Sequence, residues 1–358
     1  MENSTARIKI AIIGTGLIGP RHATSVSASP NAALHCFVDP RAETAAVAES
    51  FRVPWYESVQ AMLQAERHPE AAIVCTPNHT HVAVATELLR AGIHVLVEKP
   101  LATSIEDGKK LIETAKDSDR HLIAGHHRRF NPYVTAAKQA LEQGKIGRSI
   151  AVSGIWAAYK PDSYFSPPTE WRAGVTGGPI LINLVHDLDI LQYLLGSITR
   201  VHAEKALCMR GNQAEEGAAI LLRFASGVVG TFLLSDASPS AHNFESGTGE
   251  NPAIPRMGKD FYRIFGSEGT LSVGDMTVSR HDDVDGVEKS WTSLLNEKVL
   301  AVGQQVPFDE QVENFIAVVR GLEQPRCTGL DGLSALVVCD AVRQAMVSGQ
   351  PVDIGEIM

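Results

Sequence analysis

Near the start of the chain, residues 8–19 read IKIAIIGTGLIG. The first six form an apolar run typical of a buried strand, and helix-like sequence begins near Ile18. A strand, a glycine-rich turn and a helix present backbone N–H groups and a helix N-terminus to a pyrophosphate. Here Gly14 allows the tight turn, Gly16 lets phosphates approach the backbone, and Gly19 lets helix and strand pack closely. The stretch predicts a dinucleotide-binding domain.

An acidic residue at the end of the next apolar run supports this prediction. Asp39 lies 20 residues after Gly19, where a carboxylate would bind ribose hydroxyls. A carboxylate there repels a 2′-phosphate, so we expect NAD. Arg41 offsets that preference if it pairs with the phosphate, which keeps NADP possible; alternatively, it is a solvated residue in the first turn of the next helix.

The two parts of the chain differ in their pattern of apolar and polar stretches. Up to residue 125, short apolar runs alternate with amphipathic stretches, which predicts a parallel α/β sheet covered on both faces, a Rossmann domain at residues 1–125. The runs are 8–13, 34–38, 71–75, 93–97 and 121–124. Residues 126–358 instead carry longer strand-like stretches with turns between them, interrupted by one strongly apolar helix at 179–195. We expect an α+β domain on a large, mainly antiparallel open sheet, with a long loop over 237–259.

Bulk properties exclude several classes of protein. The net charge of −9 argues against a general nucleic-acid surface. No apolar run reaches the roughly 18 residues of a membrane span, and the first six residues lack the order of a secretory signal. The five cysteines are isolated, which supports neither a metal site nor a disulfide framework. We therefore expect a cytoplasmic protein without metal.

Polar side chains follow three of the predicted strands. They lie at residues 76–79, 98–100 and 125–129, and ligands of such sheets bind beyond the carboxyl ends of the strands. Lys99 emerges from the sheet at this edge. Asn78 has a second interpretation, as the cap of the helix that begins near Thr80.

The apolar helix at 179–195 carries two polar side chains away from its main apolar stripe. Asn183 and His186 are three residues apart and share a face. Buried polar groups must find partners, and a substrate hydroxyl is one candidate. A satisfied core histidine is the other interpretation of His186.

Taken together, these motifs resemble those of the glucose–fructose oxidoreductase, inositol dehydrogenase and rhizopine-catabolism (Gfo/Idh/MocA) family. The residues that carry the resemblance are GTGLIG at 14–19, TPN at 76–78, EKP at 98–100, RRF at 128–130, WR at 171–172, GG at 177–178 and HDLD at 186–189. The resemblance implies a two-domain fold and NAD(P)-dependent oxidation or reduction of sugars, cyclitols and related polyols. It also implies homodimers or homotetramers joined through the open sheet of the second domain.

Residue by residue, Lys99 matches the catalytic lysine of the family and His186 the catalytic histidine. The usual catalytic Asp lies four residues before that His, and here the position holds Ile182, with Asn183 one residue later. In the expected hydride transfer His186 is the general base, Lys99 holds the substrate oxygen and Asn183 orients the substrate. The reverse assignment, with Lys99 as the base, stays open.

The predicted contacts form three sets. Cofactor contacts are Gly14, Thr15, Gly16, Leu17, Ile18, Asp39, Arg41, Thr76, Pro77, Asn78, His81, Glu98, Lys99 and Arg172. Substrate contacts are Lys99, His126, Arg128, Tyr159, Asn183 and His186. Loop residues that would cover the pocket are Tyr159, Tyr164, Phe244, Glu245 and Arg256. For Arg172, which follows Trp171, a stacked surface arginine is the alternative.

Two other functions stay open. One is a dinucleotide-sensing regulator without chemistry, since the fold that the chain resembles also occurs in a repressor. The other is an enzyme for a carboxylated or imine substrate, suggested by the basic cluster at 126–129. The competing interpretation of that cluster is that Arg128 and Arg129 make salt bridges between the domains.

Overall fold

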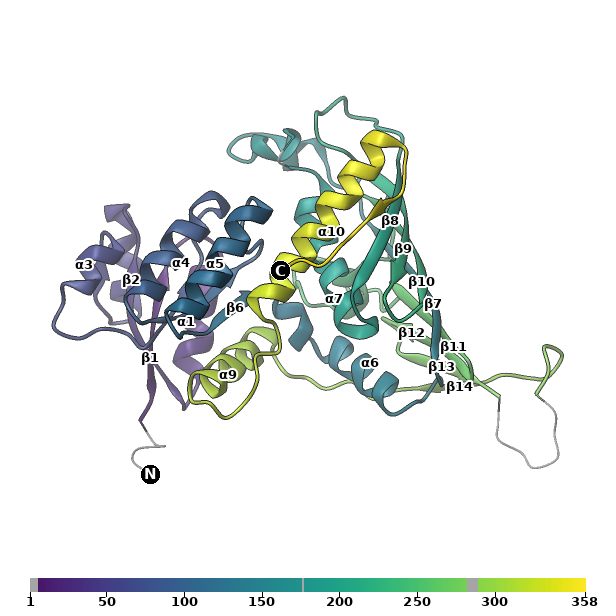
Figure 1. Ribbon diagram of the computed structural model, residues 1–358, viewed down its shortest axis with the longest axis horizontal. Coiled ribbons are helices and arrows are strands. Elements are labelled where there is room, and N and C mark those ends of the chain that lie inside the picture. Colours follow the sequence, from purple (N-terminus) through teal and green to yellow (C-terminus); the bar gives the residue numbers. More distant parts are fainter. Residues whose placement is uncertain (1–5, 176, 282–288) are drawn as a thin grey trace. The chain divides into compact units, whose positions relative to one another are not determined.

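A computed structural model describes residues 6–175, 177–281 and 289–358. The chain divides into two compact units (Figure 1). The first unit contains the chain up to Phe130, Gln305–Leu336 and Ile357–Met358. The second contains Asn131–Gln304 and Val337–Glu356.

The first unit is built on a six-stranded parallel sheet in the order β3-β2-β1-β4-β5-β6. Its strands are β1 (Ile8–Ile13), β2 (Ala32–Val38), β3 (Trp55–Tyr56), β4 (Ala71–Val74), β5 (His94–Glu98) and β6 (Leu122–Gly125). This is the doubly wound order of dinucleotide-binding domains. The five predicted strands and the parallel sheet are confirmed, whereas β3, only two residues long, was not predicted.

Helices connect and cover these strands. They are α1 (Gly19–Ala28), α2 (Ala45–Ser50), α3 (Val59–Leu63), α4 (His81–Arg90) and α5 (Ile105–Asp117), with short 3-10 turns η1 (Ala42–Thr44), η2 (Asn78–Thr80) and η3 (His127–Phe130). Ser104 caps α5 by accepting a hydrogen bond from Asp107 N. The suggested cap at Asn78 is wrong, because Asn78 lies inside η2 and no side chain caps α4.

A distant part of the chain completes this core. Helix α9 (Pro307–Val319) buries Val312 and Phe315 in the same apolar cluster as Ile10 and Ile73. Burial of one such side chain stabilises the fold by roughly 1.5–3 kcal/mol, so α9 is part of the first unit energetically as well. The long helix α10 (Gly329–Ser348) begins in the first unit and continues in the second.

The second unit contains a nine-stranded sheet in the order β14-β13-β12-β11-β7-β10-β9-β8-β15. The strands are β7 (Ser149–Ala157), β8 (Ile198–Lys205), β9 (Gly217–Phe224), β10 (Val229–Ser235), β11 (Tyr262–Gly266), β12 (Gly269–Val273), β13 (Thr277–Arg280), β14 (Asn296–Val299) and β15 (Val352–Asp353). Every described pair is antiparallel except β7 with β10, which confirms the mainly antiparallel sheet.

One face of this sheet is open. Along β9 and β10 buried residues such as Ile220 and Phe232 alternate with exposed residues such as Leu221 and Leu233. Such alternation marks a sheet with one face packed on a core and the other left uncovered within its own chain.

The apolar helix predicted at 179–195 is present in two parts. A π-helical segment, Ile180–Leu184, leads into α7 (Val185–Leu195). Within it the Val185 N–H reaches back five residues to the Ile180 carbonyl. Single π-turns of this kind concentrate at functional sites. The unit also contains helix α6 (Pro132–Glu142) and two 3-10 turns, Asp162–Phe165 and Glu170–Ala173.

The long loop predicted over 237–259 is partly wrong. Residues Phe244–Thr248 form a short helix, α8, whose five residues are all buried. Asn243 caps its start by accepting a hydrogen bond from Ser246 N, and Gly249 ends it with a φ of +74°. Asn and Gly suggested a loop from composition, but here they are helix caps.

None of the described helices is long and apolar enough to cross a membrane.

Candidate functional site

The glycine turn after β1 has the geometry that its sequence predicts. Gly14 adopts a φ of +96°, and a Cβ on it would lie 2.8 Å from the Cys75 carbonyl carbon. A Cβ on Gly19 would lie 2.1 Å from the Gly14 oxygen. Above Gly16, in contrast, no described atom lies within 4 Å of such a Cβ. Two glycines therefore serve backbone packing, while the third leaves room for a phosphate beside the start of α1.

Asp39, at the end of β2, is held by its own neighbours. Its carboxylate accepts hydrogen bonds from Thr15 N and Oγ1 at 2.9 and 2.7 Å. It also accepts bonds from the Arg41 backbone N at 3.1 Å and from Nε and one terminal guanidinium nitrogen, both at 2.9 Å. Burial alone would raise the pKa of Asp39, but these bonds outweigh it and hold the pKa below its ordinary value. Arg41 is therefore not simply solvated: it places a half-exposed cation beside the carboxylate.

Glu98 ends β5 directly before Lys99 and is almost fully buried. Its carboxylate bonds to His22 Nε2 on α1 at 2.8 Å and accepts a bond from Lys99 N at 3.2 Å. Burial acts to raise the pKa of Glu98, yet the His22 bond and nearby positive charge lower it to about 2. Glu98 thus stays ionised and joins the helix of the glycine turn to the backbone of Lys99.

His81 connects the segment that follows β4 with the segment that follows β5. Its Nδ1 lies 2.8 Å from the Pro100 carbonyl oxygen, and its Nε2 lies 2.9 Å from that of Thr76. Burial lowers the pKa of His81. The ring is 1% exposed, so within its unit it acts as a brace between the segments that carry Thr76 and Lys99.

Asn183 and His186 are both buried in the second unit, at 8% and 5% exposure. The Asn183 Oδ1 accepts a hydrogen bond of 2.7 Å from Lys160 Nζ. Lys160 was missed by the sequence analysis. Its position three residues after the end of β7 could have identified it. Polar residues just beyond strand ends were considered only in the first part of the chain.

Lys160 is itself nearly buried and surrounded by aromatic rings and charges. Its Nζ lies 5.2 Å from the Trp156 ring centroid, 4.8 Å from that of Tyr164 and 3.7 Å from an Asp236 carboxylate oxygen. Burial lowers the pKa of Lys160 to about 8, against the opposing effect of the carboxylates of Asp236 and Glu245.

Arg172 is partly buried and stacks on an aromatic ring of its own unit. Its guanidinium carbon lies 3.9 Å from the Tyr164 ring centroid, and NH1 donates to the Tyr164 carbonyl oxygen at 3.3 Å. Trp171, its neighbour in the turn Glu170–Ala173, is 49% exposed. Tyr159, a predicted substrate contact, is 56% exposed.

Of the five residues predicted to cover the pocket, Phe244 and Glu245 are buried in the second unit, Tyr164 is partly buried, and Tyr159 and Arg256 are exposed. Phe244 and Glu245 lie in the buried helix α8, so placing them on a covering loop was wrong. Glu245 accepts a bond of 2.8 Å from Trp156 Nε1, and Arg256 donates to the Tyr133 hydroxyl. Tyr164 lies in the turn Asp162–Phe165 beside Lys160.

The basic cluster at 126–129 is largely buried. Arg129 donates to the Arg326 carbonyl oxygen at 2.8 Å and pairs with Asp331 at 3.3 Å. All three residues belong to the first unit, so this salt bridge lies within that unit. His126 and Arg128 are buried at 1% and 6% exposure.

The predicted site residues divide between the two units. The first unit holds the glycine turn, Asp39, the 76–81 segment, Glu98 and Lys99, and the second holds Arg172, Asn183 and His186 together with Lys160. In the part of the chain that the structure describes, no three His, Cys, Asp or Glu side chains group as a metal site.

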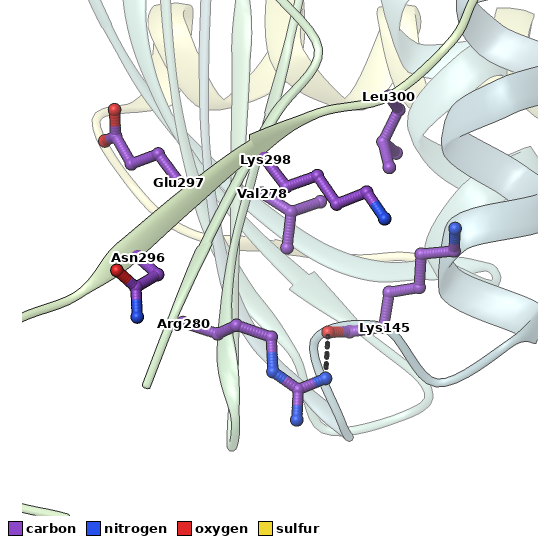
Figure 2. Close-up of a pocket in the computed structure, with 7 residues that line it drawn as sticks. All are labelled: Lys145, Val278, Arg280, Asn296, Glu297, Lys298 and Leu300. Atoms are coloured by element: carbon purple, nitrogen blue, oxygen red, sulfur yellow. Dashed lines mark hydrogen bonds between the residues drawn. The ribbon is translucent and has the colours of Figure 1, made fainter. Parts of the chain in front are cut away.

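A separate hollow of about 330 Å³ lies in the second unit near the edge strand β14 (Figure 2). It is lined by Lys145, Val278, Arg280, Asn296, Glu297, Lys298 and Leu300, none of which is a predicted site residue.

Comparison with known proteins identifies the family of the chain. Residues 8–126 match the oxidoreductase family with an NAD-binding Rossmann fold, and residues 138–354 match the C-terminal alpha/beta domain of the same family. The chain belongs to the Gfo/Idh/MocA oxidoreductase family. It is therefore an NAD-dependent oxidoreductase, which confirms the resemblance and the expected cofactor.

Several members of the family are similar over almost the whole chain. The scyllo-inositol 2-dehydrogenase (NAD(+)) of Bacillus subtilis is 27% identical and covers 97% of this chain and 96% of its own length. The myo-inositol 2-dehydrogenase of Thermotoga maritima is 25% identical, covering 98% and 100%. The WlbA dehydrogenase from Bordetella pertussis, solved with NADH and UDP-GlcNAcA, has a TM-score of 0.79 at 22% identity and covers 99% and 100%. At that identity the last likeness supports the fold alone.

Proposed function

We propose that this oxidoreductase is an NAD-dependent dehydrogenase that oxidises a secondary alcohol of a sugar, cyclitol or related polyol. The observation that carries the proposal is Lys99, placed at the carboxyl end of β5 in an NAD-binding sheet and fixed there through Glu98 and His22. The inositol dehydrogenases among the relatives support the substrate class.

The first unit holds the cofactor in this proposal. The turn at 14–18 binds the pyrophosphate through its open space above Gly16 and the start of α1. Asp39 and Arg41 bind the adenine-side ribose, and the segments at 76–81 and 98–99 line the nicotinamide. When bound, NAD supplies the hydride acceptor, C4 of the nicotinamide.

The second unit contributes proton transfer and orientation. His186 takes the hydroxyl proton, because an imidazole can accept a proton near neutral pH. Lys99 donates a hydrogen bond to the substrate oxygen and stabilises the negative charge that develops there. Asn183 replaces a carboxylate and can only hydrogen-bond, so it orients the substrate and takes no proton.

Steady-state turnover tests this function. The full chain is incubated with NAD⁺ and a panel of cyclitols, aldoses and sugar acids, and NADH formation is followed by absorbance. We expect turnover with at least one member and loss of it in Lys99→Ala. If calorimetry shows NAD⁺ binding but no polyol or sugar acid is oxidised, the chain is a dinucleotide-sensing regulator and the proposal fails.

The open sheet face supports an oligomer. Exposed apolar residues on neighbouring strands include Ile150, Leu221, Val229, Leu233 and Phe265. We infer that a second copy covers this face, giving a homodimer or homotetramer. Light scattering of wild type and of Leu221→Asp/Leu233→Asp tests it: the wild type should be at least dimeric and the variant monomeric. A monomeric wild type would contradict the inference.

We also propose a cytoplasmic location. Four cysteines, Cys36, Cys75, Cys208 and Cys339, carry free thiols, as expected of a reducing compartment.

A further inference from the structure

The strongest unexplained feature of the molecule is the contact between Lys160 and Asn183. An ammonium group can only donate hydrogen bonds, so the Asn183 atom at 2.7 Å from Lys160 Nζ must be the carbonyl oxygen Oδ1. The orientation of the amide is therefore determined by chemistry. Its Nδ2 group then points away from Lys160 with two N–H donors.

Those donors have no acceptor among the residues that the structure describes. Asn183 is more than nine-tenths buried, yet no described residue accepts a hydrogen bond from its Nδ2. The Nδ2 nitrogen is not among the fully buried atoms without a partner, so it reaches accessible space, where a ligand can accept its hydrogen bonds. Asn183 also lies on the same helical stretch as His186, three residues before it.

Lys160 has donor capacity left as well. Of its three ammonium protons, one is directed to Asn183, and the Asp236 oxygen lies at 3.7 Å, beyond hydrogen-bond distance. Two aromatic rings, Trp156 and Tyr164, flank the ammonium without accepting a conventional hydrogen bond.

The nearby carboxylates are already engaged by other donors. Asp236 is 1% exposed and bound by Arg210 at 2.7 Å, and Glu245 is bound by Trp156 Nε1 at 2.8 Å. Arg172 adds a further positive charge that acts on Lys160. The carboxylates of Asp236 and Glu245 partly balance the charge of Lys160, and the cluster still offers donors of Lys160 and Asn183 to a ligand.

We propose that Lys160 and Asn183 form a two-donor site for a carboxylate of the substrate, so that the polyol oxidised by this enzyme is a sugar acid. This rests on the proposed dehydrogenase function. A carboxylate oxygen placed between Lys160 Nζ and Asn183 Nδ2 satisfies both donors and compensates the burial of the ammonium. The carboxylate thereby anchors the substrate on the wall that carries His186.

Matched pairs of neutral and acidic sugars provide the test. Initial rates with NAD⁺ are measured for D-glucose against D-glucuronate and D-galactose against D-galacturonate, with myo-inositol as a further neutral substrate. The kcat/KM of the acid should exceed that of its neutral partner by about 10- to 100-fold, the value of a charge-assisted hydrogen bond. In Lys160→Met this acid-to-neutral ratio should fall by the same factor.

Matched variants separate this role from a structural one. Lys145→Met removes another partly buried lysine of the same unit, in the hollow of Figure 2, and should leave the ratio unchanged. Lys160→Arg retains the charge and should keep most of the preference. Asn183→Asp preserves a partner for Lys160 but repels a carboxylate, so it should lower the ratio even if Lys160→Met fails to fold.

Failure of this proposal is distinct from failure of the dehydrogenase function. Oxidation of neutral sugars with no preference for acids, or an acid preference that survives Lys160→Met and Asn183→Asp, overturns the carboxylate site and leaves the dehydrogenase intact. Absence of turnover on every substrate overturns the function itself. In that case calorimetric titration of D-galacturonate into the NADH-loaded protein still decides the carboxylate site: wild type should bind, and Asn183→Asp should not.

Discussion

The strand-end edge of the first unit and the Asn183 face of the second differ in how they are assembled. The first consists of backbone turns and of residues adjacent in sequence, such as Glu98 and Lys99, braced by His22 and His81. The second brings side chains from distant segments together, so that Lys160, Asn183 and Asp236 meet only in the folded chain. The residues proposed to hold the cofactor are thus encoded locally, and those proposed to select the substrate come together only in the tertiary structure.

The largest effect that tests this division is expected at Lys99. Lys99→Ala removes the donor to the substrate oxygen and should lower kcat by about 10²- to 10⁴-fold, while the calorimetric Kd for NAD⁺ stays within a few-fold of wild type. If a folded Lys99→Ala variant retained turnover, Lys99 would not take part in the reaction. The strand-end edge of the first unit would then lack the catalytic role that we assign to it.

The brace between His22 and Glu98 should matter for stability as well as for activity. His22→Ala leaves the buried Glu98 without its partner and should cost about 3–5 kcal/mol of unfolding free energy, measured by urea denaturation at pH 7. His35→Ala, which removes a more exposed histidine bonded to the Arg67 carbonyl, is the control and should cost at most about 1 kcal/mol. Equal losses of unfolding free energy in the two variants would show that the bond between His22 and Glu98 stabilises the fold no more than the bond of His35 does.

The same carboxylate predicts a pH dependence of stability. The pKa of Glu98 is lowered to about 2 from an ordinary 4.5, so its contribution is fully present above pH 4.5. It is lost as the pH falls from 4.5 towards 2, by about 3 kcal/mol in total. Unfolding free energies of wild type and Glu98→Gln, measured from pH 6 to pH 3, should converge at the acidic end. If the unfolding free energies of the two proteins changed in parallel with pH, the lowered pKa of Glu98 would be contradicted.

At the other face, binding of acids should weaken in alkaline solution. Lys160 has a pKa lowered to about 8 by burial, and Asp236, Glu245 and Arg172 are the main charged groups that act on it. Above that pH the uncharged amine cannot pair with a carboxylate, so KM for a sugar acid should rise up to tenfold per pH unit. The rise should move to higher pH in Lys160→Arg, and a KM independent of pH from 7 to 9.5 would contradict a role for the charge.

The smallest effect is expected at the adenine-side ribose. Arg41 pairs with Asp39 through two side-chain hydrogen bonds and weakens the repulsion of a 2′-phosphate. Arg41→Ala should therefore increase the preference for NAD⁺ over NADP⁺, as the ratio of kcat/KM values, by about tenfold. Arg90→Ala, an exposed arginine at the end of α4, should not change that ratio.

Much of the first unit was predictable because its signals are local. Apolar runs ended by Gly14, Asp39 and Lys99 placed the strands of the parallel sheet and its ligand-binding edge. The joining of α9 to the core of the first unit was not foreseen, because Val312 and Phe315 fit any amphipathic helix. The domain boundary at residues 125 and 126 stays a prediction.

The second unit was less predictable for the same reason. His186 and Asn183 were found because they interrupt an apolar helix, but Lys160 lies in a polar stretch where a lysine is unremarkable. Helix α8 was missed since Asn243 and Gly249 are equally common in loops and at helix ends. Only the burial of Lys160 and its contact with Asn183 distinguish it from a surface lysine.

The most direct test of the central claim is the fate of the hydrogen on the oxidised carbon. A sugar or sugar acid that the enzyme oxidises is prepared with deuterium on that carbon, and the NADH formed is examined by mass spectrometry and NMR. If hydride passes directly from that carbon, every NADH molecule formed should carry one deuterium at C4 of the nicotinamide. NADH without deuterium, or formation of NADH that is unaffected by Lys99→Ala, would contradict it.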